Sequence, residues 1–248
     1  MIIKPEIIVS DDAAQAAHKG AALLAGSVKQ SLIERNLFAL ALSGAATPRS
    51  MHRTFAREPY RSHVPWHRVH VFWVDDRCVC PGDPASNYGA ARADLLDRVP
   101  IPARHVHPMP FAMEPGEGAL SYEQEMRAVL ESEKGEGLFL DMMFLGLGLD
   151  GHVASLFPGD KSLEERDRLV IAVRGGDPDL PRLTMTLPLI NRTRQIVFLV
   201  TGKDKAPVVR SVLEGEGEDL PARRVQPLEG TLTWLLDREA ASMIHLRG

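Results

Sequence analysis

Short apolar runs alternate along the chain with longer segments of helical periodicity. The apolar runs are typical of strands buried on both faces of a sheet. They cover residues 6–10, 37–43, 68–75, 142–145, 169–173, 182–188 and 195–202, with 104–109 as a further short candidate. Helical patterns begin at Asp11 or Asp12 and run to about Glu34, and others begin near Pro48, Tyr88, Ser121, Lys205 and Gly230.

This alternation of strand and helix predicts an α/β fold with a mostly parallel sheet flanked by helices. The chain of 248 residues has 44% hydrophobic residues, enough to bury a large core. We see no internal repeat, low-complexity linker or break in composition. We therefore expect residues 1–248 to form a single domain.

One glycine-rich stretch, "FLGLGLDGHVASLF" at residues 144–157, carries the strongest chemical signal. Gly146, Gly148 and Gly151 spell the G-x-G-x-x-G pattern of dinucleotide-binding turns, but Pro158 stops any following helix after about a turn and a half. The stretch therefore favours a loop at the end of a buried strand that presents Asp150 and His152. Such a pair suits general-base chemistry, although Asp150 capping a short helix beside an exposed His152 is the alternative.

Small residues follow a second strand in "LALSGAATPRS", where Ser43, Gly44 and Thr47 precede or begin a helix. Backbone N–H groups at such a turn can bind phosphate. A tight strand-to-helix turn that binds nothing is the alternative.

Charged residues follow a third strand, where Asp75, Asp76 and Arg77 come in succession. They can bind a metal ion, aim one cation at an anionic ligand, or form a solvated cluster. Lys203 and Lys205 stand where the helix after Gly202 begins, a costly place for cations unless an anion is near or the side chains extend into water.

Net charge sets limits on the partners. The formal charge of −4 offers no broad field for nucleic acid or an anionic membrane. Two cysteines one residue apart are poorly placed for a mutual disulfide, and the first twelve residues read as neither a signal peptide nor a membrane span. We expect a cytoplasmic protein that acts without nucleic acid or membrane.

Four motifs in this order resemble the 6-phosphogluconolactonase family. They are "SGAATP" at 43–48, "VHVFWVDDRCV" at 69–79 with "SN" behind it, "LGLGLDGHVASLFPG" at 145–159, and "RLTMTLPLINRTRQIVFLVTGKDKA" at 182–206. The family usually has S-G-G-S-T-P and D-E-R in the first two motifs, so Ala45, Ala46 and Asp76 are departures.

The resemblance implies a Rossmann-like fold shared with the glucosamine-6-phosphate isomerase group and no cofactor. We also expect no metal, because no plausible set of metal ligands is visible in the sequence. It implies hydrolysis of 6-phospho-D-glucono-1,5-lactone in the oxidative pentose phosphate pathway, with a sugar-phosphate lactone as the small-molecule partner and a monomer or small homo-oligomer. Alternatives are a sugar-phosphate isomerase or deaminase of the same fold and a non-catalytic sugar-phosphate sensor.

The resemblance also suggests roles for individual residues. The catalytic candidates are His152 as the base that activates water, Asp150 as its orienting partner, and Arg77 at the carbonyl oxygen or the phosphate. Binding of the substrate and its phosphate is expected from Ser43, Gly44, Thr47, Asp75, Arg182 and Lys205.

Overall fold

The structure is a computed structural model that describes residues 3–44, 46–134, 140–215 and 219–245. Its strands are β1 (Glu6–Ser10), β2 (Phe38–Leu42), β3 (Val69–Trp73), β4 (Asp75–Arg77), β5 (Met142–Leu145), β6 (Val170–Gly175), β7 (Leu180–Met185), β8 (Gln195–Val200) and β9 (Thr231–Asp237). Its α-helices are α1 (Ala13–Glu34), α2 (Ala46–Phe55), α3 (Tyr60–His63), α4 (Asn87–Asp94), α5 (Pro115–Lys134), α6 (Leu187–Ile190) and α7 (Ala206–Glu214).

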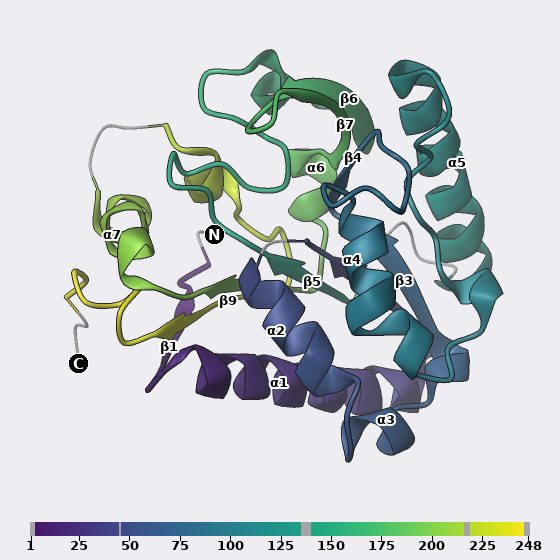
Figure 1. The fold of residues 1–248 in the computed structure, drawn as a ribbon, viewed down its shortest axis with the longest axis horizontal. Helices are drawn as coiled ribbons and strands as arrows, with labels where there is room; N and C mark the ends of the chain where they lie inside the picture. Colours follow the sequence, from purple (N-terminus) through teal and green to yellow (C-terminus); the bar gives the residue numbers. More distant parts are fainter. Residues whose placement is uncertain (1–2, 45, 135–139, 216–218, 246–248) are drawn as a thin grey trace.

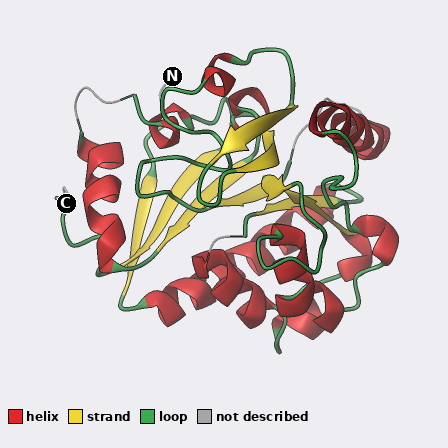
Figure 2. Ribbon diagram, turned by 45° about the horizontal axis from the view of Figure 1, so that its top comes forward, coloured by secondary structure: helices red, strands yellow, loops and turns green. Residues whose placement is uncertain are grey.

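The larger sheet of the described residues is six-stranded, in the order β1-β9-β8-β5-β2-β3, and every neighbouring pair in it is parallel. Every residue of β2 and of β5 is buried, as expected for central strands covered on both faces. Helices lie on both sides of this sheet (Figure 2). The predicted α/β fold with a parallel sheet flanked by helices is confirmed.

The order of the strands reverses direction between β2 and β5. From β2 the chain moves outward to β3, whereas from β5 it moves the other way to β8 and β9. The loops that leave the carboxyl ends of two such strands diverge, and the crevice between them is the usual ligand site of open α/β sheets. This topology therefore predicts a site beside Ser43 and Gly146.

A second, antiparallel sheet has the order β4-β7-β6. It lies above the larger sheet in Figure 1, with α5 packed beside it. The strands predicted at 169–173 and 182–188 correspond to β6 and β7, although β7 ends at Met185 and α6 begins at Leu187. Their separation from the parallel sheet was not predicted. Arg77 of β4 pairs with Arg182 of β7, so this small sheet brings two predicted site residues together.

Two predicted elements were wrong. The segment 104–109 contains a short 3₁₀ helix and a single bridge from Val106 to Val71. The ladder ends there because the Tyr122 hydroxyl takes the next pair of hydrogen bonds, accepting from the Trp73 N–H at 2.9 Å and donating to the His107 carbonyl at 3.0 Å. The helix predicted from Gly230 is strand β9, which fills the place between β1 and β8. Its residues from Leu232 to Asp237 are all buried, and a run without a polar face does not distinguish strand from helix by periodicity.

Other local predictions were correct. Asp12 caps α1 by accepting a hydrogen bond from the Gln15 N–H at 2.7 Å. Cys78 and Cys80 are both free.

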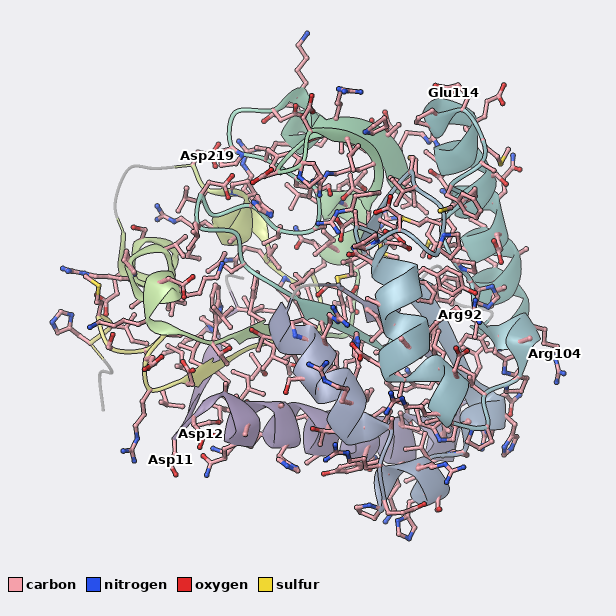
Figure 3. All side chains as sticks on the ribbon, in the orientation of Figure 1. Asp11, Asp12, Arg92, Arg104, Glu114 and Asp219 are labelled. Carbon is pink, nitrogen blue, oxygen red and sulfur yellow. The ribbon has the colours of Figure 1, made fainter. Side chains whose placement is uncertain are left out.

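No helix among the described residues is long and apolar enough to cross a membrane. Charged side chains of both signs project from the surface, as Asp11 and Arg104 do in Figure 3.

The carboxylate of Glu123 joins α5 to the small sheet. It accepts hydrogen bonds from Arg168 Nε at 2.9 Å and the Leu169 N–H at 3.0 Å, and its other oxygen accepts from Arg127. Burial raises the pKa of Glu123, but these donors together outweigh burial and hold the pKa below its ordinary value of 4.5. The interaction therefore stabilises the fold above that ordinary value and is lost as the pH falls through the lower, folded-state pKa.

We expect Glu123→Gln to lower the free energy of unfolding at pH 7 by about 1.5–3 kcal/mol, because donors to a buried carboxylate lose their charged acceptor. The difference from wild type should shrink as the pH is lowered below about 4. Urea unfolding across pH measures both. Glu131→Gln is the matched control, since Glu131 pairs with the same Arg127 but is exposed, and it should cost at most about 0.5 kcal/mol. Equal losses in the two variants would contradict the assignment.

Candidate active site

A cavity of about 920 Å³ opens at the carboxyl ends of β2 and β5. Eight of the nine residues predicted from the sequence line it: Ser43, Gly44, Asp75, Arg77, Asp150, His152, Arg182 and Lys205. The ninth, Thr47, does not line the cavity, and its hydroxyl contacts that of Thr201 at 2.9 Å. The crevice expected from the strand order is therefore the place where the predicted residues meet.

The glycine-rich loop after β5 is a compact turn and not the start of a helix. The Gly148 N–H donates to the His152 carbonyl at 2.9 Å, and the Gly151 N–H donates to the Gly148 carbonyl at 3.1 Å. Gly151 has φ +84°, which disfavours residues with a Cβ atom. A Cβ atom on Gly148 would overlap the His152 ring. Two of the glycines are thus needed to bring the histidine close to the turn, and this geometry argues against a dinucleotide cradle.

His152 and Asp150 form a hydrogen-bonded pair in this loop. Nδ1 of His152 lies 2.6 Å from Asp150 Oδ1, and the His152 backbone N–H donates to the same oxygen at 3.1 Å. Because a carboxylate only accepts, Nδ1 carries the proton and the opposite ring nitrogen, Nε2, is left as the basic one. Burial raises the pKa of Asp150, but the hydrogen bonds and charge of His152 together hold it below its ordinary value.

The turn after β2 lies directly against the start of α4. A Cβ atom on Gly44 would overlap Oδ1 of Asn87, so only glycine fits there. Ser43 Oγ is buried without a hydrogen-bond partner among the described residues, and Ser43 lines the cavity. A buried hydroxyl of this kind is available to a ligand. Ala45 and the side chain of Ala46 lie outside the described residues, so the effect of their departure from the family motif stays a prediction.

The acidic pair after β3 is divided between two roles. Asp75 lines the cavity, whereas Asp76 accepts hydrogen bonds from the N–H groups of Asn87 and Tyr88 and holds the start of α4. Burial raises the pKa of Asp76 to about 6, against the effect of these bonds. Among the residues described, no three His, Cys, Asp or Glu side chains are grouped to hold a metal ion.

Four cationic residues line the cavity, and one of them, Arg174, forms an ion pair with Asp179 at 3.1 Å. Arg182 is fixed from behind, since Nε donates to the Gly175 carbonyl at 2.7 Å and its guanidinium lies over the Phe157 ring. Burial lowers the pKa of Arg182, and the positive charge of the nearby Arg77 lowers it further. Lys205 donates to the Leu147 carbonyl at 2.9 Å, which ties it to the glycine-rich loop.

Three further parts of the site were not assigned from the sequence. Asn87 and the turn with Gly175 and Gly176 line the cavity, and Ser155, which does not line it, donates to Asp75. Asn87 and Ser155 were both inside quoted motifs, and the paired glycines between two strands are a turn signal. None carries an ionisable side chain, so the search for reactive groups passed over them.

The fold and site together define an α/β protein in which a carboxylate-bound histidine and several cations meet at a topological switch point, an arrangement suited to chemistry on a small anionic molecule. The chain belongs to the family of glucosamine-6-phosphate isomerases and 6-phosphogluconolactonases, whose model matches residues 11–234. The predicted family and its fold are therefore confirmed.

Several known proteins are similar over most of the chain. The 6-phosphogluconolactonase of Synechocystis sp. is 41% identical over 88% of this chain and 89% of its own length. That of Nostoc sp. is 37% identical over 90% and 92%. The crystal structure of 6-phosphogluconolactonase from Thermotoga maritima superposes with a TM-score of 0.82 at 28% identity, covering 94% of this chain and 100% of that one.

We expect Gly148→Ala to displace the His152 ring from Asp150 while the protein stays folded, because the new methyl group meets only the ends of side chains. Nitrogen-15 NMR should show that the neutral His152 ring is protonated at Nδ1 in the wild type and that Gly148→Ala loses this preference for Nδ1. The His152 signals are assigned as those that are missing from the spectrum of His152→Asn. Gly82→Ala, where a Cβ atom meets nothing within 4 Å, is the control. An unchanged His152 tautomer in Gly148→Ala would contradict the described geometry.

Proposed function

We propose that this protein hydrolyses 6-phospho-D-glucono-1,5-lactone to 6-phospho-D-gluconate, with His152 as the base that activates water. The observation that carries the proposal is the 2.6 Å contact between His152 Nδ1 and Asp150 in a cavity that Arg77, Arg182 and Lys205 also line. The names of the curated relatives support the same substrate.

The histidine suits the first step, attack of water on the C1 carbonyl. With Nδ1 held by Asp150, Nε2 accepts a proton from water, and the carboxylate stabilises the imidazolium that forms. The ring is partly exposed at the cavity and lies beside Phe157, at 5.1 Å between centroids. When the C1–O5 bond breaks, the imidazolium returns this proton to O5. O5 becomes the C5 hydroxyl group, and the ring is open.

The phosphate fits the end of the cavity formed by Ser43, Gly44 and Lys205. Thr47 contacts Thr201 at 2.9 Å, which brings the start of α2 beside the end of β8, four residues before Lys205. A helix start, an unpartnered hydroxyl and a lysine are chemically suited to a phosphate dianion. Arg77 donates to Asn87, which lies against Gly44, and it also lines the cavity. It therefore stabilises either the phosphate or the negative charge that develops on the carbonyl oxygen.

Cytoplasmic location, a monomeric or small homo-oligomeric state, independence of nucleic acid, metal and cofactor, and a single domain over 1–248 stay predictions. The isomerase or deaminase alternative would use a carboxylate such as Asp75 to move a proton between carbon atoms, and a non-catalytic sensor would bind the lactone without turnover.

The decisive assay uses freshly prepared 6-phosphogluconolactone coupled to 6-phosphogluconate dehydrogenase, with spontaneous hydrolysis subtracted and a chelator in a parallel arm. We expect chelator-resistant hydrolysis by the wild type, and a kcat about 10²–10⁴-fold lower in His152→Asn, which cannot accept the proton. His18→Asn, an exposed substitution on α1, should match wild type.

Four results would count against the proposed reaction or these roles. Binding of the lactone without turnover would favour the sensor, loss of activity on chelation would favour a metal mechanism, and wild-type kcat in His152→Asn would leave the histidine without a catalytic role. Turnover of glucosamine 6-phosphate in place of the lactone would favour the isomerase or deaminase.

Replacing Lys205 by alanine separates phosphate binding from chemistry. Loss of a charge-assisted hydrogen bond costs about 1.5–3 kcal/mol, so KM should rise roughly tenfold to a hundredfold. The preference for phosphorylated over plain gluconolactone should shrink. A modest fall in kcat is also expected, because Lys205 braces the loop through the Leu147 carbonyl. Steady-state kinetics on both lactones measure these effects.

Lys203→Ala is the matched control, since Lys203 stands in the same 3₁₀ turn but is exposed and does not line the cavity. It should leave KM and kcat unchanged. A large loss of kcat in Lys205→Ala, with KM and phosphate preference intact, would instead put Lys205 at the lactone carbonyl.

A further inference from the structure

Ser155 connects the glycine-rich loop to the floor of the cavity. It lies three residues after His152, has no exposed surface, and donates from Oγ to Asp75 Oδ2 at 2.7 Å. Its backbone N–H donates to Thr184 Oγ1 at 3.2 Å, which fixes the serine against β7. A buried hydroxyl held on both sides in this way sets the position of the carboxylate that it contacts.

Asn87 holds the same carboxylate from the other side. Its Nδ2 donates to the Asp75 backbone carbonyl at 2.8 Å and to Asp75 Oδ1 at 3.3 Å. These bonds fix the amide orientation, so Oδ1 of Asn87 faces Arg77 and accepts from Nη1 at 3.1 Å. A continuous set of hydrogen bonds therefore runs from Ser155 through Asp75 and Asn87 to Arg77.

We propose that Ser155 and Asn87 are positioning residues that aim the Asp75 carboxylate at a ring hydroxyl of the bound lactone. This inference rests on the proposed lactonase function. Each carboxylate oxygen has two lone pairs, and the two donors occupy one on each oxygen. Asp75 lines the cavity, so the remaining lone pairs are available to a ligand.

The chemistry of the substrate selects the group that Asp75 contacts. A carboxylate accepts hydrogen bonds and repels both the phosphate and the negative charge that develops on the carbonyl oxygen. The uncharged lactone ring offers only its hydroxyl groups as donors, at C2, C3 and C4. Asp75 thus accepts a hydrogen bond from a hydroxyl group of the ring. Because Asn87 bonds to both Asp75 and Arg77, it also fixes the carboxylate relative to the guanidinium.

The test pairs variants with substrates. Ser155→Ala is assayed on 6-phosphogluconolactone and on its 2-deoxy, 3-deoxy and 4-deoxy analogues. We expect kcat/KM to fall about tenfold on the parent lactone, the cost of weakening one hydrogen bond to a charged group. On the analogue that lacks the recognised hydroxyl the fall should be about twofold or less, because the variant and the missing hydroxyl remove the same interaction.

Asn87→Ala provides a second line of evidence if Ser155→Ala does not fold. Its loss on the parent lactone should be larger, because Arg77 loses an acceptor as well, and the smallest loss should fall on the same deoxy analogue. Ser27→Ala is the control, since Ser27 is also a buried serine but its Oγ has no hydrogen-bond partner among the described residues. It should change no substrate by more than about twofold.

Two outcomes separate the positioning role from the function itself. An equal loss on all four lactones, or no loss on any, would overturn the positioning role while wild-type hydrolysis leaves the function standing. Wild-type protein that does not accelerate hydrolysis would overturn the function, and the positioning role with it.

Discussion

The parallel pairing of β2 with β5 is the constraint on which the site depends. A single buried carboxylate reinforces that pairing at the start of β5: Asp141 accepts from the Ala39 N–H at 2.7 Å and from the Arg35 guanidinium. Its backbone N–H also donates to the Ala39 carbonyl, and its own carbonyl accepts from the Gln195 N–H, so one residue ties β2, β5 and β8 together. With these strands in register, the turn at Gly44 and the loop at Gly146 must leave the sheet side by side.

The loops convert that register into a chemical site. Gly148 and Gly151 allow a turn tight enough for Asp150 to reach back to the ring of His152, and Gly44 lets α4 approach with Asn87 at its start. Each of these glycines is required by a close approach or a positive φ. In a dinucleotide turn the glycines let the backbone approach pyrophosphate, whereas here they make room for side chains of the protein itself. The same spacing thus has a different physical use here.

The small antiparallel sheet adds the cationic wall. The β4–β7 register places Arg77 opposite Arg182, and burial together with the charge of Arg77 lowers the pKa of Arg182. Two like charges opposite each other are unfavourable, so this wall favours the binding of an anion. The family includes isomerases as well as lactonases, so the fold alone leaves the reaction open. The side chains around the cavity therefore carry the functional argument, and buried contacts such as that of Ser155 with Asp75 set their positions.

Local signals in the sequence were sufficient for much of the fold and for most of the site. Strands such as 195–202, the Asp12 cap and the strand-end positions of Ser43 and His152 depend on short-range patterns of hydrophobicity, capping and turn residues, which the sequence states directly. The errors came where distant parts of the chain decide the structure. The apolar run after Gly230 is a strand because it fills the place between β1 and β8, and the segment after Arg104 forms only one bridge because the Tyr122 hydroxyl takes the next hydrogen bonds. Residues far apart in the chain come together in the separate sheet of β4, β6 and β7, in the contact of Ser155 with Asp75 and in the contact of Thr47 with Thr201. Only tertiary packing fixes such pairs, because no local pattern encodes which distant hydroxyl or amide will satisfy a buried carboxylate.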